Sequence, residues 1–197
     1  MLAYFKKTLF FIEFMADHVL LKREFEQARD QQYRISRSVD DSMTCYGKSL
    51  YLCNRLEAYS YQSRLIVAEI SWKSVFDCLR ELDPSLSTAI DALREPSNSD
   101  FGLHIYSQVL VDDDWKTADP TWEYELSPPF PFIEWDGTKN SQLAVPVKTV
   151  YTPEESSRIL STIDAMRRIA PSNSNQLFYS RFNDLLQCVR LRNLEAA

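Results

Sequence analysis

The period of the hydrophobic residues changes once along this chain, near residue 100, and this change limits the possible folds strongly. Between Phe10 and Leu93 the apolar side chains recur at spacings of three, four or seven residues, as in helices that bury one face. From Leu103 to Val111 they alternate instead, which is typical of a strand. Helices followed by strands predict the α+β class, with helix dominant.

The chain is expected to begin and end with helices. Helical periods cover residues 8–32, 52–66, 72–82 and 86–93, and Ser71 and Asp83 are the predicted caps of the last two. Alternating patterns predict strands at 103–111, 122–126 and 143–151, which would form a small antiparallel sheet. Thr152 and Glu155 match a capping box, so a helical hairpin should follow, to residue 192.

The length of 197 residues fits one compact domain, and 45% apolar residues are enough for a substantial core. We therefore expect a single domain over 1–197, with a helical part at 1–95, a small sheet at 101–151 and the helical hairpin at 152–192. The polar run at 95–100, which contains Pro96, is the clearest internal boundary.

Acidic and aromatic side chains are concentrated between Asp112 and Asp136. This segment holds eight carboxylates against the single base Lys116, which makes it more negative than the whole chain, whose net charge is −6. It also contains three of the four tryptophans. Negative charge beside large flat side chains is typical of a surface that binds a basic protein partner.

Composition and spacing argue against several classes of protein. The net charge and a pI near 5.0 disfavour nucleic acid as a ligand, because phosphate binding needs clustered Lys and Arg. Three widely separated glycines cannot form a phosphate loop or a dinucleotide fingerprint. His18 and His104 lie far from each other and from any cysteine at ligand spacing, so we expect no metal and no cofactor. Both histidines are predicted to be structural.

The four cysteines fall within predicted helices and form no Cys-x-x-Cys pair. In such positions they are predicted to pack as small apolar residues in a reducing compartment. Glu13 and Asp17 interrupt the apolar stretch near the N-terminus, and no apolar run approaches the roughly 18 residues that a membrane span needs. The sequence therefore predicts a cytoplasmic protein without a membrane contact.

Twelve residues of the acidic segment are the predicted partner-binding site, with carboxylates meeting Lys and Arg around the partner's active cleft and aromatic side chains anchoring the centre. They are Asp112, Asp113, Asp114, Trp115, Asp119, Trp122, Glu123, Glu125, Phe132, Glu134, Trp135 and Asp136. The general profile is similar to that of the immunity proteins that bacteria keep against secreted toxins, which are small, acidic, mixed α/β proteins. The resemblance implies a non-enzymatic inhibitor that neutralises a basic toxin.

Two alternatives remain open from the sequence. Glu123 and Glu125 lie two residues apart on a predicted strand, at a spacing compatible with the carboxylate pair of a hydrolase acting on sugars. The phenylalanines of the first helix (Phe5, Phe10, Phe11 and Phe14) cannot all face one core, so a self-associating scaffold or homodimer is the other alternative.

Overall fold

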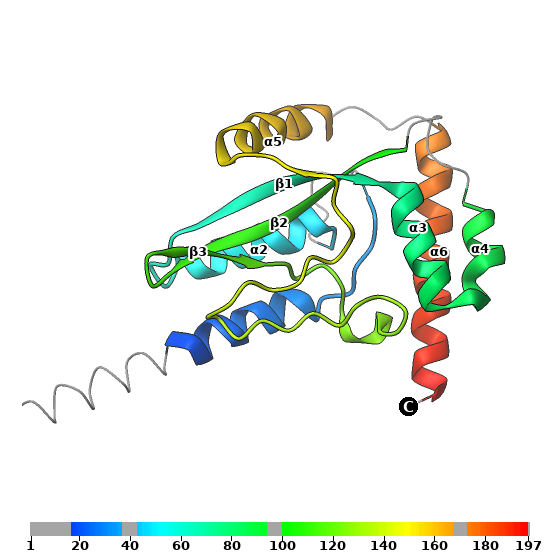
Figure 1. Ribbon diagram of the computed structural model, residues 1–197, viewed down its shortest axis with the longest axis horizontal. Helices are drawn as coiled ribbons and strands as arrows, with labels where there is room; N and C mark the ends of the chain where they lie inside the picture. Colours follow the sequence, from blue (N-terminus) through cyan, green and yellow to red (C-terminus); the bar gives the residue numbers. More distant parts are fainter. Residues whose placement is uncertain (1–16, 37–42, 94–99, 168–172, 197) are drawn as a thin grey trace, which may run out of the picture.

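The computed structural model describes residues 17–36, 43–93, 100–167 and 173–196 (Figure 1). Its centre is a four-stranded antiparallel sheet in the order β3-β2-β1-β4. The strands are β1 (Ser63–Ser71), β2 (Phe101–Val111), β3 (Asp114–Ala118) and β4 (Thr149–Val150). Helices precede this sheet, interrupt it and follow it, so the predicted α+β class with helix dominant is confirmed.

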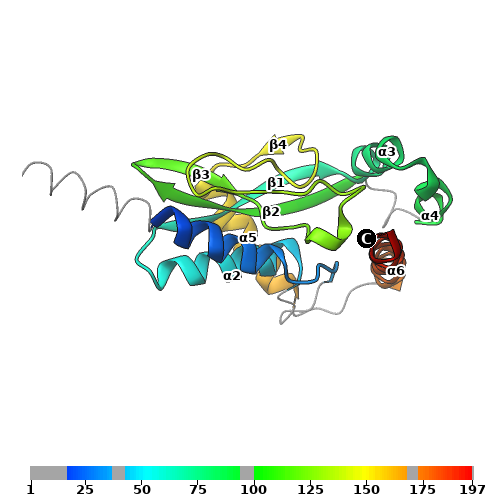
Figure 2. The same ribbon diagram turned by 90° about the horizontal axis from the view of Figure 1, so that it is seen from below.

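Helices cover one face of the sheet and one of its ends. The described helices are residues 17–29, α2 (Cys45–Glu57), α3 (Trp72–Leu82), α4 (Ser87–Asp91), α5 (Pro153–Arg167) and α6 (Asn173–Ala196), with 3-10 turns η1 (Pro84–Leu86) and η3 (Tyr124–Leu126). Figure 2 shows helix 17–29 and α2 against one face, while the chain that leads to β4 crosses the opposite face. α3, α4 and α6 stand together beyond one end of the sheet (Figure 1).

The second predicted helix is shorter than expected, because residues 63–66 belong to a strand. α2 ends at Glu57, and a turn with a positive φ of 66° at Ser60 leads into β1. β1 then pairs with β2 over nine consecutive residues. Ile66, Val67 and Ala68 are all buried, so this strand is covered on both faces and lacks the alternation that reveals a strand in a sequence.

The strand predicted at 122–126 is wrong, and a strand that the sequence did not predict lies just before it. Asp112 and Asp113 both have positive φ, at 51° and 63°, and form the two-residue turn between β2 and β3. β3 therefore begins at Asp114, and the chain has left the sheet by Trp122. Residues 122–126 instead belong to a segment outside the sheet that contains η3, in which Trp122 and Leu126 are buried and Tyr124 is exposed.

The last part of the chain keeps its predicted elements but not their predicted packing. Thr152 and Glu155 form the expected capping box, with the Thr152 N–H donating to Glu155 at 2.9 Å. α5 packs on β1, where Ser156 accepts a hydrogen bond from the Val67 N–H at 3.0 Å. α6 packs on η3, where Asn193 donates to backbone carbonyls. The strand predicted over 143–151 is reduced to the two residues of β4.

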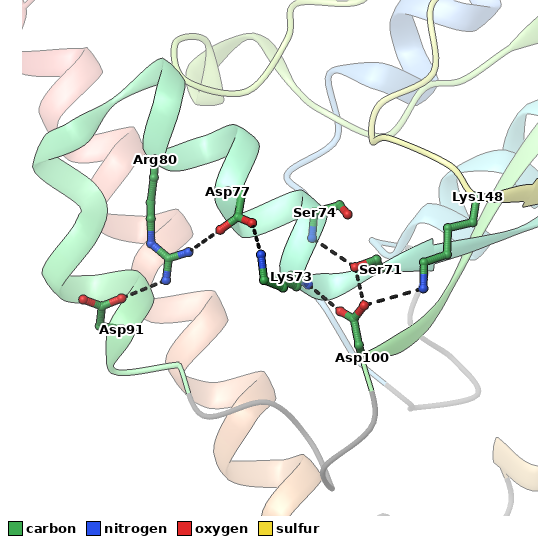
Figure 3. Close-up of polar contacts among 8 residues, drawn as sticks. All are labelled: Ser71, Lys73, Ser74, Asp77, Arg80, Asp91, Asp100 and Lys148. Carbon is green, nitrogen blue, oxygen red and sulfur yellow. Dashed lines mark hydrogen bonds and ion pairs between the residues drawn. The ribbon is translucent and has the colours of Figure 1, made fainter.

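A chain of polar contacts fixes α3 to the end of the sheet (Figure 3). The Ser71 hydroxyl caps α3 by accepting from the Ser74 N–H at 3.1 Å, which confirms the predicted cap. That hydroxyl donates to the Asp100 carboxylate, which also accepts from the Lys73 N–H at 2.6 Å. Lys148, which precedes β4, lies 3.5 Å from the same carboxylate. Asp100 thus joins the start of β2 to β1, α3 and the approach to β4.

We expect Asp100→Ala to lower the urea concentration at which the protein unfolds at pH 7, because the Lys73 N–H at the start of α3 and the Ser71 hydroxyl both lose their acceptor. Hydrogen bonds from Ser71 and Lys73 lower the pKa of Asp100 below 3.8, so this stabilisation is present above that pH. It should disappear as the pH falls through the lowered pKa. Lys148→Met is the matched control and should have a smaller effect, since it removes only one exposed ion pair.

Candidate functional site

A cysteine occupies the first position of α2. Thr44 caps this helix, with its side-chain oxygen accepting from the Gly47 N–H at 3.0 Å. Cys45 follows directly and is half-buried. The first amides of a helix and its dipole place partial positive charge here, which favours a thiolate over a thiol.

The Cys45 thiol lies near His104, which is on β2, and near the backbone N–H of Ile105, and both lower the pKa of the thiol. On the other side of the imidazole, Nε2 of His104 is 2.7 Å from Oδ2 of Asp119. Because Nε2 faces the carboxylate, Nδ1 is the nitrogen left for the sulfur. The His104 imidazole therefore contacts the Asp119 carboxylate through Nε2 and has the Cys45 thiol nearby.

Asp119 is held by neighbours from two directions. Its Oδ1 accepts from the N–H and the hydroxyl of Thr121, at 3.2 and 2.6 Å. Its Oδ2 accepts from the Ala144 N–H at 2.7 Å in addition to His104. The Asp119 N–H donates in turn to Ser141 at 3.0 Å. Four donors to one fully buried carboxylate stabilise its ionised form and fix its orientation toward the imidazole.

The protonation of the three groups follows from this geometry. Burial alone would lower the pKa of His104, but the charge and hydrogen bond of Asp119, together with Cys45, raise it to about 10. Burial alone would raise the pKa of Cys45, yet His104 outweighs burial and lowers it below 9.0. Burial is likewise outweighed by His104 at Asp119, whose pKa falls below 3.8. The pairing of the two groups therefore favours a thiolate beside an imidazolium over a neutral thiol beside a neutral imidazole.

Small polar side chains bring α2 close enough to β2 for this contact. Ser49, one turn after Cys45, donates its hydroxyl to the Ile105 carbonyl at 3.2 Å. The Ser107 hydroxyl donates to the Ser49 carbonyl at 3.1 Å. Both serines are completely buried. Because neither side chain is bulky, the helix and the strand approach closely, and the thiol reaches the imidazole one residue away on β2.

The predicted partner-binding residues do not share one surface. Asp119, Trp122, Glu123 and Trp135 are buried in the interior, with at most 3% of each residue exposed. Burial removes these four from the predicted surface, because their side chains are used to build the core and its ion pairs. Of the remaining eight, Trp115 and Glu125 are partly exposed and the others are exposed, namely Asp112, Asp113, Asp114, Phe132, Glu134 and Asp136.

The carboxylate pair considered for a sugar hydrolase is not formed. Glu123 accepts from Arg190 at 2.6 Å and from the Tyr33 N–H at 2.8 Å, inside the core. Glu125 lies on η3, so the two carboxylates are not neighbours on one face of a strand. Glu123 instead anchors α6 to the segment after helix 17–29. The phenylalanines considered for self-association lie outside the described residues.

No known protein family, curated protein or solved structure matches this chain. Within the described ranges, no helix is both long and apolar enough to cross a membrane. In the same part of the chain, no group of three or more His, Cys, Asp or Glu side chains is arranged to hold a metal ion. The site is therefore interpreted from its own geometry.

The sequence contains a partial signal for this site. Cys45 follows a polar break and the capping residue Thr44, so it was recognisable as the start of a helix rather than an interior position. His104 lies in a strand, and Asp119 precedes Pro120 at the end of the next one. What the sequence does not show is that β2 and β3 are neighbours, which brings residues 104 and 119 together. The structural role predicted for His104 stays a prediction, because the sequence does not show that Asp119 lies beside this ring.

We expect the His104 ring to carry protons on both nitrogens at pH 7 and to lose one near pH 10. Proton and nitrogen NMR of the imidazole, followed from pH 5 to 11, measures this directly. Asp119→Asn removes the neighbouring charge, so the titration should move to lower pH. A wild-type titration near the ordinary value of 6.5 would contradict the ion pair.

Proposed function

We propose that this protein is a cysteine-dependent acyl transferase or hydrolase, with Cys45 as the nucleophile, His104 as the acid and base, and Asp119 as the residue that orients the imidazole. The observation that carries the proposal is the buried 2.7 Å contact between His104 and Asp119, with Cys45 at the first position of α2 close enough to His104 for each to shift the pKa of the other. Nucleophile, base and orienting group in this order recur on unrelated folds, and geometry rather than sequence position identifies them.

In the first step, the Cys45 thiolate attacks the carbonyl carbon of an ester, thioester or amide, and the carbonyl oxygen becomes negative. The N–H of Cys45 is one of the first amides of α2, which have no acceptor within the helix, and is suited to donate to this oxygen. The bond to the leaving group then breaks, and His104 transfers its Nδ1 proton to that group. The acyl group remains on Cys45 as a thioester.

In the second step, neutral His104 removes a proton from water or from an acceptor amine or alcohol. The resulting nucleophile attacks the thioester, and the Cys45 thiolate leaves, which restores the starting ion pair. Asp119 remains ionised throughout and stabilises the imidazolium each time it forms. Water as acceptor gives hydrolysis, and an amine or alcohol gives transfer.

Alkylation by iodoacetamide tests the reactivity of the thiol without knowledge of the substrate. Because only the thiolate reacts, we expect Cys45 to be alkylated at pH 6 at least about tenfold faster than the exposed Cys188, although Cys45 is less accessible. Peptide mass spectrometry over a time course measures both rates in one sample. His104→Gln should remove the advantage of Cys45, while Cys188→Ser should leave the Cys45 rate unchanged. Equal or slower alkylation of Cys45 at pH 6 would refute the activated thiol.

We propose as a second function that the exposed aspartates of the β2–β3 turn bind a basic protein, such as a secreted toxin. Support comes from the exposed carboxylates of Asp112 and Asp113 at the tip of the turn, next to Asp114, which begins β3 and pairs with Lys116 at 2.5 Å. Such a cluster favours fast, salt-sensitive association with a cationic surface. This function does not require Cys45.

Replacing Asp112 and Asp113 by Asn removes two charges and retains a residue that tolerates positive φ. The wild-type protein is first used as bait to recover its basic partner from the native host. We expect this partner to associate more slowly with the double variant, and its association rate to depend less on the salt concentration. Association rates measured by biolayer interferometry at several salt concentrations provide the test. Glu57→Gln with Glu81→Gln is the control of equal charge change. An unchanged association rate for the aspartate variant would argue against this surface.

A further inference from the structure

A buried lysine lies one turn after Cys45 on the same helix. Lys48 is completely buried, which is rare for lysine without compensating partners. Its Nζ donates to three backbone carbonyls, those of Arg29 at 2.6 Å, Gln31 at 2.8 Å and Thr121 at 2.9 Å. An ammonium has three N–H donors, so every donor is used and the charge is solvated by the backbone.

Two of these carbonyls belong to the end of helix 17–29 and the turn that follows it. The third belongs to Thr121, whose N–H and hydroxyl hold the Asp119 carboxylate. The contacts therefore close a ring that runs from Lys48 through Thr121, Asp119 and His104 to Cys45, and back along α2. One side of this ring is a rigid helical turn, and the opposite side is the His104 imidazole.

We propose that Lys48 is a positioning residue for the acyl-transfer site, whose ammonium ties the helix that carries the thiol to the turn that carries the carboxylate. This inference rests on the proposed acyl-transfer function. Without the lysine, three buried carbonyls lose their donor, and the turn at Thr121 is free to move away from α2. Movement of Asp119 would weaken its hold on His104, and the thiolate would lose part of its stabilisation.

The test is the pH dependence of Cys45 alkylation in Lys48→Met. Burial lowers the pKa of Lys48 to about 7, so wild type and variant are compared from pH 5 upward, with pH 6 as the reference point where the ammonium is retained. We expect the midpoint of the alkylation profile to rise by about one pH unit, with the rate at pH 6 falling on the order of tenfold. A purely structural lysine would lower stability without moving this midpoint.

Leu56→Ala is the matched control. Leu56 is completely buried on the same helix, near its far end, and its truncation to alanine destabilises the protein by leaving a cavity. It should leave the midpoint of Cys45 alkylation unchanged. If Lys48→Met shows no cooperative unfolding transition, Lys48→Gln replaces it, with a smaller shift expected in the same direction because its amide keeps two donors.

The outcomes separate the two proposals. If a folded Lys48 variant keeps the wild-type midpoint of Cys45 alkylation, the positioning role of Lys48 is overturned. The proposal that Cys45 is reactive is not affected by this result. A wild-type protein whose Cys45 has no advantage at pH 6 overturns the acyl-transfer function itself. A shifted midpoint in the Lys48 variant together with an unshifted one in Leu56→Ala supports both.

Discussion

The arrangement around Cys45 depends on the buried ion pair between His104 and Asp119. Opposite charges are stable inside a protein only when their remaining donors and acceptors are also satisfied, because both have lost their water. Here Thr121 and Ala144 supply the donors to the carboxylate, and they come from opposite ends of the segment that follows β3. The turn after β3 and the chain that leads to β4 must therefore both be in place for the pair to form. The chemistry of the thiol is thus coupled to the folding of the second half of the chain.

A second set of buried charges joins the helices to this centre. Lys48 holds the end of helix 17–29 and the turn at Thr121, while Glu123, two residues further, pairs with Arg190 of α6. Arg190 also donates to the Tyr33 carbonyl, in the segment after helix 17–29. These contacts connect the two helical groups through one short stretch, residues 119–123. This explains why Asp119 and Glu123 of the acidic segment lie inside the molecule: they pair with His104 and Arg190, two buried cations of this chain.

Local signals in the sequence predicted much of the fold. Ser71, Asp83 and Thr152 each cap a helix as expected, because a cap is determined by neighbouring residues. β2 was predicted from its alternation, whereas the start of β1 was not, because residues 63–66 continue the helical period of the preceding helix. The site was not predicted because its three residues are far apart in the sequence. Residues 45, 104 and 119 become neighbours only through strand pairing and helix packing. The composition of the acidic segment predicted a binding surface instead, although four of its predicted binding residues are in the core.

The most direct test of the account is whether Cys45 accepts an acyl group. The protein would be incubated with p-nitrophenyl acetate at pH 6, quenched in acid and mapped by peptide mass spectrometry. The account predicts an acetyl group on Cys45 that is lost on longer incubation, and no such adduct in His104→Gln. Absence of acetyl-Cys45 in the wild type, or equal labelling of Cys45 and the exposed Cys188, would contradict it.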